Sequence, residues 1–225
     1  MPVINPFESS ARKYDDWYET DFGKYADRLE EKLMLELLKP EAGQTLLDIG
    51  CGTGRHLLLF KNFGLKVTGV DTSPLMLDEA KKKVDEKSLV HLSEEELLPF
   101  EDKSFDLSII FLTLEFCKNP IRILKEAERV TKGRIFIGFL NRISFLALKR
   151  RIKGLFKYSV YNRARFFSLS ELHGILESHF EFKALSWKGV IFLPWLKFKL
   201  WQRLDLKLSF IKNPFCAFIG VLIKL

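Results

Sequence analysis

The sequence has few cysteines and no long uncharged apolar run. Its 225 residues include scattered cysteines that follow neither a disulfide framework nor a metal-ligand spacing: Cys51, Cys117 and Cys216. No apolar run reaches the roughly 18 residues of a membrane-spanning helix, and residues 1–6 do not resemble the start of a signal peptide. With 47% hydrophobic and 29% charged residues, the chain is expected to be a globular, cytoplasmic protein that needs no metal.

Acidic residues are absent from one long segment. Residues 129–170 contain no Asp or Glu in a chain whose net charge is +7. The basic residues of this segment are Arg129, Lys132, Arg134, Arg142, Lys149, Arg150, Arg151, Lys153, Lys157, Arg163 and Arg165. Such a surface attracts nucleic acid, anionic lipid or an acidic small molecule, although a merely solvated basic surface fits the pattern equally well.

Strand patterns alternate with helical patterns along most of the chain. Strands are expected at residues 45–50, 66–71, 89–92, 105–112, 134–140, 181–187 and 215–225. Helices are expected at residues 8–39, at 55–64, from 73 onward, at 119–130 and at 168–178. This order predicts an α/β fold with a doubly wound, Rossmann-like, mostly parallel seven-stranded sheet and helices on both faces.

The expected organisation is a single domain over residues 1–225. Its parts are an N-terminal helical cover at 1–43, a ligand-binding core at 44–141 and a C-terminal half at 142–225. The C-terminal half carries two expected cap insertions, at about 142–167 and 189–212. An amphipathic surface helix within 189–212 would suit contact with a membrane surface, and core packing of its aromatic residues is the alternative.

The most informative segment is the glycine-rich turn after the strand at 45–50. Gly50, Gly52 and Gly54 allow the backbone to approach a nucleotide-like ligand closely. The dinucleotide fingerprint requires a glycine where this chain has Arg55, and no GxxxxGK[ST] sequence occurs. The pattern therefore favours a ligand that has an adenosine and no pyrophosphate, a description that S-adenosylmethionine fits.

Further features follow the glycine turn in order. Asp71 ends the second strand, where an acid can accept hydrogen bonds from both ribose hydroxyls or, alternatively, cap the next helix. An acidic segment then leads into Leu98-Pro99-Phe100 and Phe105-Asp106. With the glycine turn, these residues resemble the class I S-adenosylmethionine-dependent methyltransferases, in particular the small-molecule branch that includes the quinone-biosynthesis methyltransferases. The resemblance covers about residues 44–141.

The resemblance implies contacts with S-adenosylmethionine, whose product would be S-adenosyl-L-homocysteine. The methionyl end is expected to lie against Asp48, Gly50, Cys51, Gly52 and Gly54. The resemblance also implies that Asp71 holds the ribose hydroxyls, with Thr72 and Met76 beside the adenine. Glu94 would receive the adenine amino group and Glu95 would offer its backbone N–H.

Some of these implied roles have alternatives. Glu94 stands where the family usually has Asp, and a solvated acidic loop is the other interpretation of this segment. Leu112 and Thr113, after the fourth strand, would face the sulfonium. Tyr14 lies in a Y-D-x-W element that folds over the cofactor in many relatives, or it anchors a surface helix.

The sequence predicts the methyl donor and leaves the acceptor open. Such an enzyme mainly positions donor and acceptor and excludes water, so no catalytic residue is assigned. Side chains that could act as a base, or serve the structure instead, are His56, His91, Glu115, Tyr161, His173 and His179. The [N/D]-P-P-[Y/F] turn typical of base and glutamine methylation is missing at 113–117. A small-molecule or lipid-like acceptor, apolar or anionic, is therefore favoured. The alternatives are an RNA methyltransferase and a non-catalytic S-adenosylmethionine-binding protein.

Overall fold

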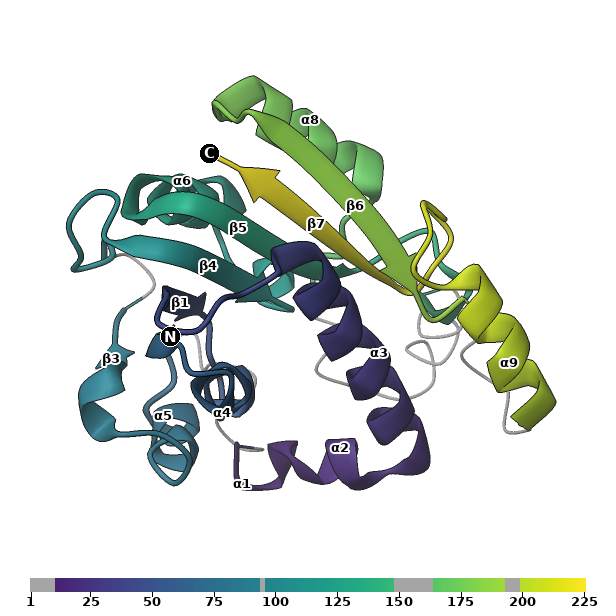
Figure 1. Cartoon of the computed structure of the whole chain (residues 1–225), viewed down its shortest axis with the longest axis horizontal. Helices are drawn as coiled ribbons and strands as arrows, with labels where there is room; N and C mark the ends of the chain where they lie inside the picture. The colour runs from purple at the N-terminus through teal and green to yellow at the C-terminus, as the bar shows by residue number, and fades with distance from the viewer. Residues whose placement is uncertain (1–10, 94–95, 148–163, 193–198) are drawn as a thin grey trace.

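One sheet organises the chain. In the computed structural model, which describes residues 11–93, 96–147, 164–192 and 199–225, seven strands lie in the order β3-β2-β1-β4-β5-β7-β6 (Figure 1). The strands are β1 (Thr45–Ile49), β2 (Lys66–Asp71), β3 (Leu89–His91), β4 (Phe105–Phe111), β5 (Thr131–Leu140), β6 (Ala184–Val190) and β7 (Phe218–Lys224). Only β7 runs antiparallel to its neighbours, β5 and β6. The predicted mostly parallel, doubly wound sheet is confirmed.

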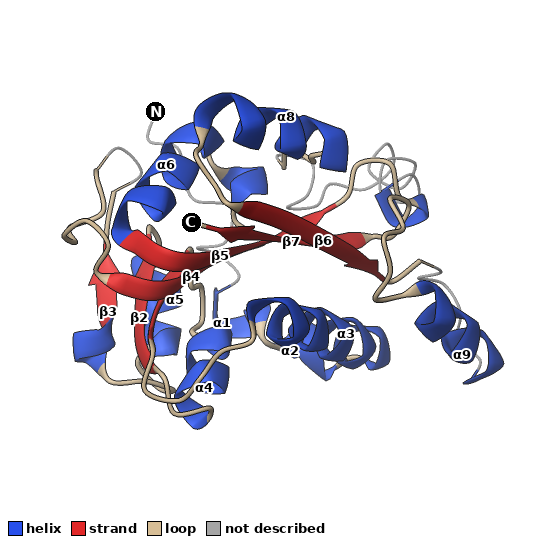
Figure 2. Ribbon diagram, turned by 45° about the horizontal axis from the view of Figure 1, so that its top comes forward, coloured by secondary structure: helices blue, strands red, loops and turns tan. Residues whose placement is uncertain are grey.

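Helices cover both faces of the sheet (Figure 2). One face carries α3 (Asp21–Leu38), α4 (Arg55–Asn62) and α5 (Pro74–Ala80), and the other carries α6 (Pro120–Val130) and α8 (Leu169–His179). The short helices α1 (Ala11–Tyr14) and α2 (Asp16–Glu19) precede α3, and α9 (Lys199–Leu208) lies beside the end of β6 (Figure 1). Single 3₁₀ turns, η2 (Glu86–Ser88) and η3 (Leu114–Phe116), precede β3 and follow β4.

The core lies in layers on the two sides of the sheet. Alternation along β5 sends Ile135 and Ile137 toward the cluster under α6 and α8, and Phe136 toward the cluster under α3. Leu33 of α3 and Phe136 are both fully buried. Because β5 is central, both of its faces are apolar, as expected for a strand in a doubly wound sheet.

Capping residues fix several helix starts where the sequence predicts them. Ser73 Oγ accepts a hydrogen bond from Met76 N at 3.3 Å, and Asn119 Oδ1 accepts one from Arg122 N at 3.1 Å. Each cap is followed by a proline in the first helical turn, which needs no N–H partner. The predicted starts of α5 and α6 are therefore confirmed.

Other boundaries differ from the sequence-based expectation. The helix expected at 8–39 is divided, because Thr20 Oγ1 caps α3 by accepting from Gly23 N at 3.0 Å. β5 begins at Thr131 rather than 134, and Lys132 and Gly133 lie at an irregularity of its pairing with β4, between the pairs Phe105–Thr131 and Leu107–Arg134, instead of closing a helix. β6 spans 184–190 rather than 181–187.

The expected division into cover, core and cap insertions stays a prediction. Residues 148–163 and 193–198, which make up much of the two expected caps, lie outside the described residues. Within the part of the chain that is described, no helix has the length and apolar character needed to cross a membrane.

Candidate functional site

The glycine turn after β1 adopts a backbone that glycine favours. Gly50, Gly52 and Gly54 have φ values of +81°, +53° and +73°. A Cβ on Gly50 would lie 2.3 Å from Thr113 Cγ2, and one on Gly54 would lie 2.9 Å from Ala80 Cβ, whereas one on Gly52 would meet nothing within 4 Å. The first and last glycines therefore allow close packing, and the middle one leaves room beside the backbone.

Asp71 connects this turn to the next helix. At the end of β2, its Oδ2 accepts from Gly52 N and its Oδ1 from Ser73 N, both at 2.8 Å. Burial raises the pKa of the Asp71 carboxyl above its ordinary value, and hydrogen bonds from backbone N–H groups oppose that shift. The carboxylate thus lies between the glycine turn and the start of α5, at the carboxyl edge of the sheet.

Asp48 is the least satisfied polar residue of the site. Its side chain is 1% exposed, and within the described residues neither carboxylate oxygen has a hydrogen-bond partner. Burial, and secondarily the nearby Asp71, raises the pKa of the Asp48 carboxyl to about 8. Burying a carboxylate without hydrogen-bond donors lowers the stability of the fold, because the charge loses its hydration and gains no partner. A cationic ligand group beside Asp48 would supply that partner and stabilise the folded protein. These residues fit a cofactor that carries an ammonium and a sulfonium.

Two predicted site residues direct their side chains into packing. The Cys51 side chain belongs to a small apolar cluster with Leu57 and Leu77, and burial raises the pKa of its thiol. Its backbone N–H already donates to Val70 O at 3.0 Å. Met76 is 3% exposed in the first turn of α5. Cys51 and Met76 therefore shape the site by packing.

The residues after β4 form the neighbouring wall. Leu112 has a φ of +52°, a left-handed conformation that a branched residue seldom adopts, and its N–H donates to Gly138 O at 2.8 Å. Thr113 Oγ1 donates to Phe111 O at 3.0 Å, and its side chain fills the space beside Gly50. The structure thus packs Thr113 against the glycine turn, and the expectation that Leu112 and Thr113 face the sulfonium stays a prediction.

The N-terminal helices are attached to the glycine turn by contacts that the sequence did not reveal. Asp15 accepts from Thr53 Oγ1 at 2.7 Å and from Lys83 Nζ at 2.6 Å, and Lys83 also donates to Thr53 O at 2.7 Å. The predicted residue Tyr14 lies next to Asp15, and its ring packs edge-on against Tyr18 with centroids 6.1 Å apart. These contacts attach the segment between α1 and α2 to Thr53 of the glycine turn.

Arg55 makes a second attachment. Its guanidinium pairs with both carboxylate oxygens of Asp27 on α3 and lies 4.4 Å from the ring centroid of Tyr18. The residue that takes the place of a dinucleotide glycine therefore fixes the start of α4 to α3.

The acidic segment after β3 lies partly outside the described residues, which exclude Glu94 and Glu95. Its following part is fixed to α6 by Arg129, whose guanidinium donates to Leu98 O, Phe100 O, Glu126 and Asp102 at 2.8–2.9 Å.

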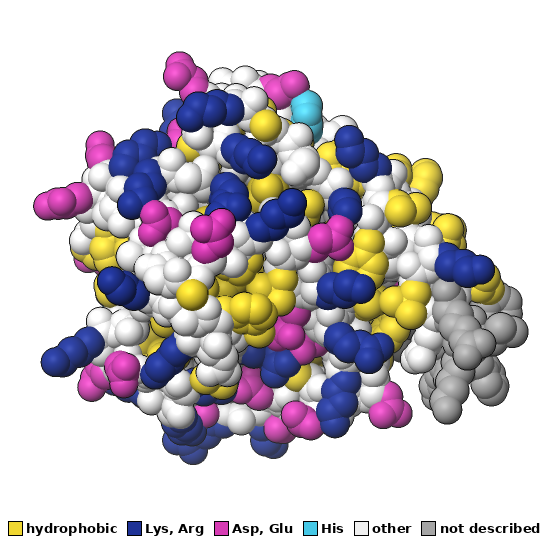
Figure 3. Space-filling view, viewed as in Figure 1, with side chains coloured by type: hydrophobic (Ala, Val, Ile, Leu, Met, Phe, Trp, Pro, Cys, Tyr) yellow, Lys and Arg dark blue, Asp and Glu magenta, His cyan; other side chains and the backbone are white. Residues whose placement is uncertain are grey.

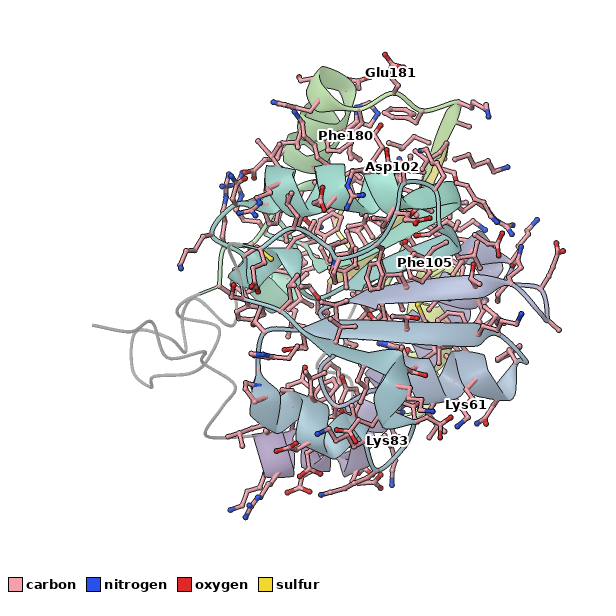
Figure 4. All side chains as sticks on the ribbon, turned by 90° about the vertical axis from the view of Figure 1, so that its left-hand side faces the viewer. Lys61, Lys83, Asp102, Phe105, Phe180 and Glu181 are labelled. Atoms are coloured by element: carbon pink, nitrogen blue, oxygen red, sulfur yellow. The ribbon has the colours of Figure 1, made fainter. Side chains whose placement is uncertain are left out.

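Figure 4 shows how these parts are arranged around the sheet. Asp102 and Phe105 lie on the side of α6, and Lys61 and Lys83 lie on the side of α4 and α5. Phe180 and Glu181 lie at the far end of α8.

The candidate bases differ in their surroundings. His56 is buried against Phe111, with ring centroids 4.2 Å apart, and burial lowers the pKa of its imidazole to about 3, so it is neutral. Glu115 is 2% exposed and accepts a hydrogen bond from Leu140 N at 2.7 Å, so it connects the turn after β4 to the end of β5. His173 and His179 lie on α8, across the sheet from the glycine turn, while His91 is exposed and Tyr161 lies outside the described residues. None of them is assigned as a catalytic base.

Comparison with known proteins shows which family the chain belongs to. Residues 47–137 match the family model of the methyltransferase domain. An uncharacterized protein of Methanocaldococcus jannaschii is 35% identical over 77% of this chain and 80% of its own length. The biotin biosynthesis bifunctional protein BioHC of Teredinibacter turnerae is 29% identical over 78% of this chain, which spans 32% of that protein.

The solved structures agree with the family model. A crystal structure of an S-adenosylmethionine-dependent methyltransferase from Thermotoga maritima, a possible histamine N-methyltransferase, is similar with a TM-score of 0.78 and 27% identity. The similarity covers 97% of each chain.

Proposed function

Since the chain belongs to the class I S-adenosylmethionine-dependent methyltransferases, we propose that it methylates a small-molecule or lipid-like acceptor, at least partly apolar. We further propose that the residues at the ends of β1 and β2 hold the cofactor, with Asp48 near its methionyl ammonium and Asp71 on its ribose. The single observation that carries this assignment is the buried Asp48 carboxylate, which has no hydrogen-bond partner among the described residues.

The remaining predicted contacts follow the same geometry. The open space beside Gly52 leaves room for the methionyl part, and Thr113 packs against Gly50 at the start of the turn. When bound, the cofactor supplies an activated methyl group on its sulfonium. The protein then has to position the acceptor and exclude water, a task that needs no strongly acidic or basic side chain.

The acceptor proposal is supported by the residues beyond β4 and β5. Those that follow the strands are largely apolar, including Leu112, Leu114, Ile143 and Phe145. Two of the proteins compared above also favour a small molecule, because one is named for biotin biosynthesis and the other as a possible histamine N-methyltransferase. A lipid-like acceptor would be met at a membrane surface, and a cytoplasmic location remains a prediction.

RNA methylation receives less support from the charges. The acid-free segment 129–170 is partly neutralised by acids from outside it: Arg129 pairs with Asp102 and Glu126, and Lys132 pairs with Asp106 at 2.9 Å. Glu171 pairs with both Arg142 and Arg165. Four of the eleven basic residues of this segment are therefore paired with acids within the described part of the chain.

The decisive experiment uses S-adenosylmethionine labelled in its methyl group. The folded protein is incubated with separate pools of small metabolites, lipids and RNA, and the label is followed into each pool. We expect transfer into the metabolite or lipid pool. Transfer into RNA alone would contradict the proposed acceptor. Binding of the cofactor without transfer to any pool would favour the non-catalytic binding protein, and folded protein without cofactor binding in calorimetry would refute the assignment of the site.

A further inference from the structure

Hydrophobic side chains are exposed at the end of the molecule where α9 and the loop into β7 lie. Ile211 is 46% exposed and Phe215 is 52% exposed, both in that loop. Leu204 and Leu206 of α9 are each 40% exposed, and Ile143, just after β5, is 49% exposed. We call these five residues the apolar end face. Figure 3 shows hydrophobic side chains gathered at this end, over the ends of β6 and β7 and the loop above α9, with lysines and arginines among them.

A rigid scaffold supports the apolar end face. Asn141 is fully buried at the end of β5, and its Nδ2 donates to Pro214 O at 2.6 Å and to Cys216 O at 2.9 Å. Its Oδ1 accepts from Ile143 N at 3.3 Å. One side chain thus holds the segment after β5 against the loop that carries Phe215. Ile143 and Phe215 therefore belong to segments that are held together, although they are far apart in the sequence.

The charge of this end has one sign. Residues 188–225 contain a single acid, Asp205, which is 1% exposed and accepts from Tyr25 Oη at 2.5 Å and from Phe192 N at 2.7 Å. Lys207 and Lys212 are exposed beside the hydrophobic residues, and neither forms an ion pair with a described residue. Asp205, the only acidic side chain of residues 188–225, is turned inward. The charged side chains that this segment exposes to solvent are therefore basic.

We propose that the apolar end face, with Lys207 and Lys212, docks the protein on the surface of an anionic lipid bilayer. Exposed aliphatic and aromatic side chains gain free energy by entering the boundary between headgroups and acyl chains, and lysines beside them are attracted to anionic headgroups. Nucleic acid would use the lysines but leave the aliphatic residues in water. Self-association would bring the lysines of two copies together, which is unfavourable.

The position of this surface suits the activity of the protein. Ile143 follows β5 at the same edge of the sheet as Leu112, so an acceptor dissolved in the bilayer would arrive on the side where the methyl group is delivered. That consequence rests on the proposed lipid-like acceptor. The docking itself does not, because it can be measured without cofactor or acceptor, and its failure is therefore distinct from failure of the proposed function.

Flotation with lipid vesicles tests the proposal. We expect the full chain to float with vesicles of phosphatidylcholine that contain phosphatidylglycerol, to float weakly with phosphatidylcholine alone, and to be released by added salt. Phe215→Ser should lower the partition coefficient about tenfold. Lys212→Glu should lower it at least about fivefold on the anionic vesicles only.

Matched variants elsewhere on the surface serve as controls. Phe63→Ser changes a phenylalanine that is 47% exposed after α4, and Lys125→Glu changes an exposed lysine of α6. Both should bind vesicles as the unmodified protein does, and the melting temperature of every variant confirms folding. The proposal is overturned if the unmodified protein does not bind anionic vesicles at low salt, or if Phe63→Ser weakens binding as much as Phe215→Ser. It is also overturned if light scattering shows a dimer that Phe215→Ser dissociates while vesicle binding is unchanged.

Discussion

Two buried aspartates distinguish the glycine-turn region from the α9 region. Asp48 in β1 and Asp205 on α9 are each 1% exposed. Asp205 accepts hydrogen bonds from Tyr25 Oη and Phe192 N, whereas Asp48 has no partner among the described residues. A buried carboxylate that accepts hydrogen bonds stabilises the segments that carry its donors. One without donors lowers the free energy of unfolding until a ligand supplies a partner. The contrast indicates that Asp205 serves packing and that Asp48 is suited to binding a ligand.

The largest effect is expected from Asp71, which shares the glycine-turn region with Asp48. Asp71→Ala should weaken S-adenosylmethionine binding about 1000-fold, because two hydrogen bonds to a charged acceptor are worth about 4 kcal/mol together. Isothermal titration calorimetry measures the loss.

Asp71 also accepts hydrogen bonds from Gly52 N and Ser73 N, so a milder variant that keeps part of this geometry is needed. Asp71→Asn retains one acceptor oxygen, and with it one of these two bonds, and should lose clearly less affinity. If Asp71→Ala bound the cofactor as the unmodified protein does, the ribose role would be wrong.

The second largest effect should appear in stability and not in binding. Asp205→Ala leaves the Tyr25 hydroxyl and Phe192 N–H buried without their acceptor, which should cost about 3 kcal/mol of unfolding free energy. Urea denaturation gives this value, and cofactor affinity should stay unchanged because α9 is remote from the glycine turn. Tyr25→Phe, which removes only one donor, should cost about 1 kcal/mol. A large loss of cofactor affinity in Asp205→Ala would erase the contrast between the two regions.

Local chemistry explains why the glycine-turn region could be predicted from the sequence. The strand before the turn, the positive φ of Gly50 and Gly54, and the cap at Ser73 all depend on neighbouring residues. The α/β order of elements follows from apolar periodicity in the same way. The glycine turn, the Ser73 cap and the order of strands and helices can therefore be predicted without knowing which residues pack against them.

Contacts between distant segments explain what the sequence did not show. Arg55 meets Asp27 across 28 positions, and Asn141 meets Cys216 across 75. Leu112 adopts its left-handed conformation where its N–H donates to Gly138 O of β5, and leucine gives no local signal of it. β6 starts later than expected because its register is set by β7, which follows it in the chain.

The third prediction concerns pH and sharpens the comparison at Asp48. The folded pKa of about 8 lies above the ordinary value, so the folded state binds more protons than the unfolded state between about pH 4 and pH 8. The unfolding free energy of the cofactor-free protein should therefore fall as pH rises through that window, by at most about 1.4 kcal/mol per pH unit. Affinity for the cationic cofactor should rise over the same window and level off above it, because the ionised carboxylate is the form that attracts a cation.

Asp48→Asn separates the two effects. Without an ionisable group, the variant should be more stable than the unmodified protein at pH 8 and should show a flatter pH profile of cofactor affinity. Thermal unfolding and calorimetry over a pH series provide both measurements. Equal pH profiles in the variant and the unmodified protein would remove Asp48 from the site.

The smallest expected effect tests whether the N-terminal helices act as a cover over the glycine turn. Lys83 joins Asp15 to Thr53, and these side chains are partly exposed, so the ion pair is worth less than about 1 kcal/mol. Lys83→Met should therefore speed cofactor dissociation about threefold in stopped-flow measurements. Lys82→Met removes a neighbouring lysine that pairs with Glu79 and does not reach Asp15, so it should leave the rate unchanged. A rate that rises only in Lys83→Met would show that the cover restrains the bound cofactor. Equal rates in both variants would make the contact a feature of packing, like that of Asp205 at the other end.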